Sequence, residues 1–148
     1  MANAKTWLSV LLIFQVSLIV ACSPRSSGVQ ELEPIVKHLQ SINHAYIKTT
    51  QQLGRPPKNA DEIRSALQEV GDPDKLLRSP IDGEEFVIIW GVDPRTEPPM
   101  DGKLPILVYE KKGIGGKRYV WQLPTRIVAM TDDELRTAYF PGNHRFSP

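Results

Sequence analysis

The sequence contains few of the residues on which disulfides, metal sites and catalytic triads depend. Cys22 is the single cysteine in 148 residues, so the chain cannot form an internal disulfide. The three histidines, His38, His44 and His144, show no metal-ligand spacing such as i, i+4, and no serine stands in a GxSxG motif. We therefore predict no catalytic residue, no cofactor and no metal ion, and we expect a protein that is not an enzyme.

The chain also has no excess of charge of one sign. Residues 1–21 hold one of the 18 basic residues and none of the 17 acidic residues, so residues 22–148 carry 17 of each. Proteins that bind nucleic acid through its phosphates need a surplus of lysine and arginine, and this balance argues against a nucleic-acid partner. The length of residues 22–148 suits one domain with a modest core.

Long apolar runs are missing as well. Residues 7–20 (WLSVLLIFQVSLIV) are interrupted by Ser9, Gln15 and Ser17, and the run is shorter than the roughly 20 residues that cross a bilayer. It follows Lys5 and precedes Ala21, an order of charge, apolar core and small residue that is typical of secretory signals. We predict that residues 1–21 are a signal peptide.

The junction Ile19-Val20-Ala21-Cys22 resembles the lipobox of bacterial lipoproteins. The resemblance implies that the Cys22 thiol is alkylated with diacylglycerol, that cleavage makes Cys22 the first residue, and that its amino group often receives a further acyl chain such as palmitate. Two acyl chains hold a protein stably in a membrane. The expected partner is therefore membrane lipid, with the soluble domain in the periplasm or at the cell surface. By the same resemblance, Ser23 slightly favours the outer membrane of a double-membraned cell.

Helices are predicted by an apolar period of 3.6 residues. Residues 22–28 form the lipidated tether, and residues 29–53 predict a long amphipathic helix that ends at Gly54-Arg55-Pro56-Pro57. Asn59-Ala60-Asp61-Glu62 predicts the start of a short helix over residues 60–70, and Asp72-Pro73-Asp74 predicts a turn. The apolar residues expected to face the core are Val29, Leu32, Ile35, Val36, Leu39, Ile42, Tyr46 and Leu53 in the first helix, and Ile63, Leu67 and Val70 in the second.

After residue 84 the apolar period changes to two, which predicts strands. Residues 85–90 (EFVIIW) are apolar on both faces and predict a central strand, followed by strands at 105–110 and 117–123 and a short one at 126–130. A glycine-rich hairpin joins the second and third strands, Thr131 begins a last small helix, and residues 140–148 are a tail. The predicted class is α+β, with the long N-terminal helix and the short second helix packed on a 3–4-stranded antiparallel meander in one domain, residues 29–148.

This order of elements resembles the globular domain of type II secretion pseudopilins and type IV pilins. Residues 53–63 (LGRPPKNADEI) are similar to the segment that leads into the second helix of major pseudopilins, and residues 79–88 (SPIDGEEFVI) are similar to their entry into the sheet. The resemblance covers residues 29–121 and implies a pilin-like fold. A lipid-tethered domain of this kind also looks like small lipoproteins of planctomycete-type bacteria.

The chain departs from the pilin pattern in two places. Prepilins carry a cleavage site followed by a long apolar helix that builds the fibre, whereas here the lipobox stands in that position, so assembly by the usual route is not expected. Some pseudopilins hold calcium in a late acidic loop. The nearest candidates here, Asp93, Glu97 and Asp101, are too sparse for that role to be carried over.

Two groups of residues are candidates for an interaction surface. Near the predicted hairpin lie the basic residues Lys111, Lys112, Lys117 and Arg118. They form either a solvated tip or a contact for an anionic partner such as lipid headgroups or cell-wall polymer. The second group is aromatic, because Tyr119 and Trp121 share one face of the third strand. They either pack on the long helix or join Tyr109 in an exposed row that binds a glycan or a peptide.

These observations favour a non-enzymatic, membrane-tethered interaction module of the cell envelope. Its partner would be an envelope protein or the cell wall, contacted through the sheet face, residues 91–103 or an open strand edge. One alternative is a lipoprotein that binds cell wall or polysaccharide, and another is a pseudopilin-related accessory component of secretion machinery. An enzyme of unknown type would need a concave pocket with converging polar groups.

Overall fold

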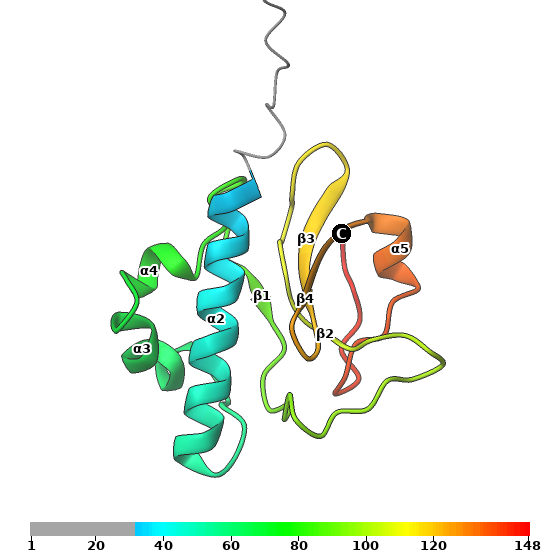
Figure 1. The fold of residues 1–148 in the computed structure, drawn as a ribbon. Coiled ribbons are helices and arrows are strands. Elements are labelled where there is room, and N and C mark those ends of the chain that lie inside the picture. Colours follow the sequence, from blue (N-terminus) through cyan, green and yellow to red (C-terminus); the bar gives the residue numbers. More distant parts are fainter. Residues whose placement is uncertain (1–31) are drawn as a thin grey trace, which may run out of the picture.

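The computed structural model describes residues 32–148 of the chain. The predicted signal peptide, the tether, Cys22 and the first three residues of the predicted long helix lie outside the described residues. Figure 1 shows helices on one side of a twisted sheet, with a further short helix and the C-terminus on the other side.

The described residues form an α+β fold with a four-stranded antiparallel sheet, as the sequence predicts. The strands follow one another in the order β1-β2-β3-β4, so each hairpin joins neighbours. The helices are α2 (Leu32–Leu53), α3 (Ala60–Gln68), α4 (Pro73–Leu76) and α5 (Asp132–Arg136). The strands are β1 (Val87–Ile88), β2 (Ile106–Tyr109), β3 (Lys117–Gln122) and β4 (Arg126–Thr131).

Helix α2 buries one stripe of its surface against the sheet. Ile35, Leu39, Ile42 and Tyr46 follow at steps of three and four residues, and all four are completely buried. The helix ends before Gly54, which has φ +66°, and Pro56 cannot continue it. Leu53 was expected on this stripe, but it is the last residue of the helix and is 46% exposed.

The second helical region differs from the prediction at its end. Asn59 accepts a hydrogen bond from the Glu62 amide and so begins α3, as predicted. The helix stops at Gln68, and Val70, which was expected in the core, is exposed. The predicted turn after it is instead the start of α4, because the Asp72 side chain accepts from the Asp74 amide and Pro73 suits a first helical position.

The prediction of a central first strand is wrong. β1 has two residues and lies at one edge of the sheet, paired with β2 alone. Phe86, Ile88 and Trp90 lie next to residues of α3 and α4, whereas Val87 shares the opposite face with its cross-strand partner Tyr109. The fourth strand, predicted to be short, pairs with β3 along six residues and forms the other edge.

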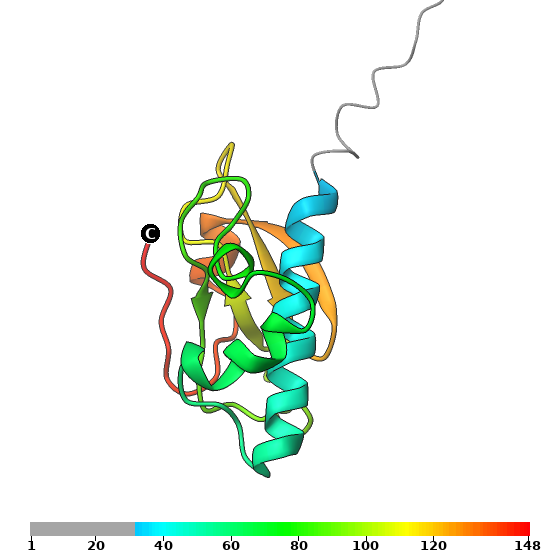
Figure 2. The ribbon, with the colours of Figure 1, turned by 90° about the vertical axis from the view of Figure 1, so that its left-hand side faces the viewer.

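The predicted C-terminal tail packs against the sheet. Cross-strand partners share a face and neighbours within a strand point to opposite faces. Tyr109 is paired with Val120, so it points away from the face that carries Trp121. Trp121 contacts Tyr46 of α2, whereas Tyr109 contacts Phe140 and residues further along the C-terminal segment. Figure 2 shows this segment and α2 on opposite sides of the sheet.

Candidate interaction site

The hairpin between β2 and β3 is closed by a tight turn. Ile114 and Lys117 exchange backbone hydrogen bonds of 3.0 and 3.1 Å around Gly115-Gly116, whose φ angles are +60° and +72°. Two consecutive positive φ angles are those of a type I′ turn, which favours glycine. Gly113 also has a positive φ, and a Cβ atom there would lie 2.1 Å from the Lys117 carbonyl oxygen. The glycine-rich segment is therefore an ordered hairpin, as predicted.

Residues 79–84 fasten this hairpin to the body of the domain. The Asp82 carboxylate accepts hydrogen bonds from the amides of Lys112, at 3.1 Å, and Gly113, at 2.7 Å. Glu84 forms ion pairs with Lys112 and, at 3.6 Å, with Lys111. Its neighbour Lys112, above all, lowers the pKa of the Glu84 carboxyl. Two of the three exposed lysines thus already have an acidic neighbour.

A completely buried carboxyl group, Glu110, lies at the base of the hairpin. The Ser79 hydroxyl donates to one carboxyl oxygen at 2.5 Å and the Tyr119 amide donates to the other at 2.7 Å. Burial raises the pKa of Glu110 above the usual glutamate value. The sequence analysis missed this residue, although a glutamate that directly follows an apolar strand is a signal for a buried acid. Through these two hydrogen bonds Glu110 ties residues 79–84 to β3.

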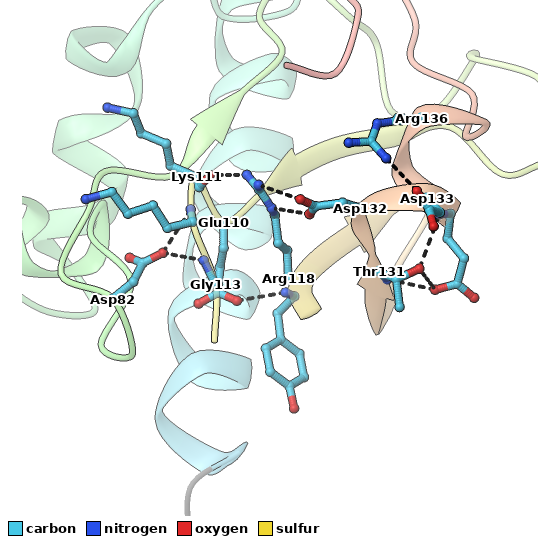
Figure 3. A network of polar contacts seen from close by, with 12 residues as sticks. Asp82, Glu110, Lys111, Gly113, Arg118, Thr131, Asp132, Asp133 and Arg136 are labelled. Atoms are coloured by element: carbon cyan, nitrogen blue, oxygen red, sulfur yellow. Dashed lines mark hydrogen bonds and ion pairs between the residues drawn. The ribbon is translucent and has the colours of Figure 1, made fainter. Parts of the chain in front are cut away.

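Arg118 is not a surface cation, contrary to the prediction. It is 5% exposed, and its guanidinium forms hydrogen bonds of 2.8 and 3.2 Å with Asp132 at the start of α5. It also donates to the Lys111 carbonyl oxygen and lies 4.7 Å from the ring centre of Phe146. Figure 3 shows Arg118 between Lys111 and Asp132. Because its hydrogen bonds are used within the domain, Arg118 links the hairpin, α5 and the C-terminal segment.

The predicted aromatic row is not exposed. Trp121 is completely buried, with its ring centre 6.2 Å from that of Tyr46, and Tyr109 is 3% exposed between Phe140 and Phe146. Tyr119 is half-buried. One of the two predicted alternatives was that Tyr119 and Trp121 pack on the long helix. For Trp121 this alternative is confirmed by its contact with Tyr46 of α2. An aromatic platform for glycan at these three positions would therefore require the domain to open.

The histidines and the acidic residues of the 91–103 loop do not converge. His38 Nδ1 lies 2.8 Å from the Arg78 carbonyl oxygen, and His144 bonds the Tyr109 hydroxyl at 3.0 Å. Asp93 pairs with Arg95, which lowers the pKa of that carboxyl, and Glu97 bonds the Tyr139 hydroxyl. Within residues 32–148, no three histidine, cysteine or acidic side chains lie close enough together to hold a metal ion.

The outer edge of β4 is an open strand edge. β4 is the last strand of the sheet, and Ile127, Val128 and Met130 are half-buried along it. A hollow of about 270 Å³ lies beside β4. The hollow is lined by both polar and apolar residues, including Leu104, Gln122, Arg126, Met130, Glu134 and Tyr139.

Comparisons of the chain with protein-family models, with curated proteins and with solved structures gave no match. Among the helices that the structure describes, none is long and apolar enough to cross a membrane.

Proposed function

We propose that this chain is an exported bacterial lipoprotein, held to membrane lipid through acylated Cys22, whose pilin-like domain serves as a non-enzymatic interaction module of the cell envelope. The signal-like order of residues 1–21 and the lipobox-like junction at Cys22 support the export and the anchor. The partner in this proposal is an envelope protein that adds an extended segment to the sheet.

The pilin-like character is supported by the arrangement of the parts. A 22-residue helix lies against an antiparallel meander, and a shorter helix precedes the first strand. The two segments that resemble pseudopilins, residues 53–63 and 79–88, fall at the break between α2 and α3 and at the entry into β1. β4 forms the edge of the sheet opposite to β1.

The open edge of β4 is the observation that carries the interaction function. A six-residue edge strand presents unpaired backbone groups that a second extended chain can bind, whereas the two-residue β1 offers almost none. Half-buried apolar side chains along β4 give such a segment side-chain contacts as well.

Photo-cross-linking in intact cells tests the use of this edge. A photoreactive amino acid placed at Ala129 of β4, which is exposed, is expected to capture a defined envelope protein. The same amino acid at Ser65, which is exposed on α3, serves as the matched control. Identical products from both positions, or products with lipid alone, would contradict the proposal.

Intact mass of the membrane-extracted protein tests the anchor. The wild-type mass should equal residues 22–148 plus two or three acyl chains, and the Cys22→Ala variant should lose the modification. An unmodified wild-type chain would overturn the lipoprotein assignment. Residues 7–20 would then be candidates for an uncleaved signal anchor.

A further inference from the structure

The tip of the β2–β3 hairpin holds an apolar side chain out of the domain. Ile114 is 65% exposed, compared with 46% for Leu53 and 50% for Met100. Its backbone is fixed by the reciprocal hydrogen bonds with Lys117, and the preceding residues are bound by Asp82. An ordered turn therefore exposes the apolar side chain of Ile114 to solvent. Burying this side chain against another apolar surface would be favourable.

This tip lies at the end of the domain where α2 begins. Figures 1 and 2 both place the hairpin tip and the first turn of α2 at the same end of the domain. The contacts agree, because His38 in the second turn of α2 bonds the Arg78 carbonyl group and Asp82 binds the hairpin. We call the region formed by residues 33–38, 78–84 and 111–117 the anchor end of the domain.

The anchor end is the part that a lipid on Cys22 would hold near the bilayer. Ten residue steps separate Cys22 from Leu32 and span at most about 35 Å. The 22 residues of α2 then lead away from this end over about 33 Å, so Leu53 lies at the far end. Leu32, the described residue nearest to Cys22 in the sequence, therefore lies at the same end of the domain as the hairpin tip, so the tether joins the domain at that end.

The charges around Ile114 suit an anionic lipid surface. Lys111, Lys112 and Lys117 are exposed beside it, and their long side chains can keep ammonium groups among headgroups while Ile114 enters the interface. Glu84 offsets part of this charge through its ion pairs. The carboxylate of Asp82 accepts hydrogen bonds from the backbone amides of Lys112 and Gly113.

We propose that Ile114, together with Lys111, Lys112 and Lys117, contacts the anionic headgroup surface of the membrane that carries the lipid anchor. This contact, which rests on the proposed lipidation of Cys22, orients the domain with α2 directed away from the bilayer and its Leu53 end in water. The lipid anchor supplies the attachment, and the hairpin tip sets the orientation.

Site-directed spin labelling of the full lipidated protein in liposomes tests this orientation. Because acylation consumes the thiol of the single native cysteine, Ile114→Cys or Leu53→Cys gives one labelling site in each variant. Both positions are exposed and apolar, so Leu53→Cys is a matched control for the label itself. In liposomes with anionic lipid, the ratio of oxygen to aqueous nickel accessibility should be several-fold higher at position 114 than at position 53.

Each other outcome overturns the proposal in a recognisable way. Equal ratios at the two positions in a protein of the correct acylated mass would overturn the membrane contact and leave the proposed anchor standing. A mass without acyl chains would overturn both. A high ratio that is the same in purely zwitterionic liposomes would overturn the assignment to anionic headgroups, and a label shielded from nickel and oxygen alike would indicate cover by protein.

Discussion

The two faces of the sheet are covered by very different structures. On one face lies α2, a regular helix whose aliphatic stripe is completely buried and meets Trp121 through Tyr46. On the other face lies an irregular C-terminal segment, attached by a hydrogen bond from the Ile106 amide to Tyr139 and by the contacts of Tyr109 with Phe140, His144 and Phe146. A helix buries surface through its periodicity, and an irregular segment needs specific contacts to stay in place.

This difference shows where the stability of the domain is concentrated. The α2 face depends mainly on burial of apolar area, which is not directional. The C-terminal face depends on a few aromatic contacts and on Arg118, which binds Asp132 and stacks on Phe146. Substitutions on the α2 face should therefore lower the free energy of unfolding strongly. Substitutions on the C-terminal face should lower it less, and their effects should depend on one another.

The largest effect is expected from Trp121→Ala. Trp121 is completely buried, so its removal should lower the free energy of unfolding by about 3–5 kcal/mol, measured by urea denaturation. Phe146→Ala on the opposite face is the comparison. Phe146 is half-buried, so the loss there should be roughly 1–2 kcal/mol. Equal losses would mean that the two faces contribute alike.

Arg118→Met should have an intermediate effect. It leaves Asp132 and the Lys111 carbonyl group without their partner, and because Asp132 is partly exposed we expect a loss of roughly 2–3 kcal/mol. In a double-mutant cycle with Phe146→Ala, the coupling energy should be about 0.5–2 kcal/mol. Arg95→Met, which breaks the surface pair with Asp93, is the control and should cost less than about 1 kcal/mol.

The smallest effect at neutral pH, and the most specific one, concerns Glu110. Because burial raises its pKa in the folded state, its contribution to stability is full below the ordinary glutamate pKa and is lost as pH rises through the raised value. In Glu110→Gln the amide oxygen can accept from the Tyr119 amide, the amide nitrogen can donate to the Ser79 hydroxyl, and the side chain cannot ionise. The stability of this variant relative to wild type should therefore increase with pH across that window.

Glu62→Gln provides the opposite slope as a control for Glu110→Gln. The hydrogen bond from Arg55 lowers the pKa of Glu62, so its contribution is present above the ordinary glutamate pKa and is lost as pH falls through the lowered value. Unfolding curves recorded from acidic to neutral pH should thus show the two variants diverging from wild type in opposite directions. Parallel behaviour would contradict the burial of a titrating Glu110.

Local patterns in the sequence predict much of the fold, and they fail where distant segments meet. The helix stripe of Ile35 and Leu39, the cap at Asn59 and the capping box of Thr131 with Glu134 are local and are found in the structure. The edge position of β1 was mispredicted because its two faces meet different parts of the fold: Ile88 lies next to α3 and α4, and Val87 faces the same side as Tyr109. A continuous apolar run indicates that both faces of a strand are apolar, but it does not indicate which segments cover them.

The candidate site follows the same division. The glycines of residues 111–116 predict the hairpin because only positive φ angles close it, and the lysines beside it are exposed. Arg118 has the same charge as these lysines and stands next to Lys117, but it is buried by Asp132 and Phe146, which come from 14 and 28 residues further along the chain. The spacing of basic residues within the hairpin does not distinguish an exposed lysine from the buried Arg118.

The sequence by itself determined the α+β class, the order of the elements apart from α4, the caps of α3 and α5, and the hairpin, because each depends on residues within a few positions of one another. The tertiary structure decided that Trp121 and Tyr109 are buried on opposite faces, that residues 140–148 cover one of them, and that Glu110 and Arg118 lie inside the domain. These features depend on packing between segments that are distant in the chain, and the free energy of burying a side chain is set by whichever segment finally lies against it.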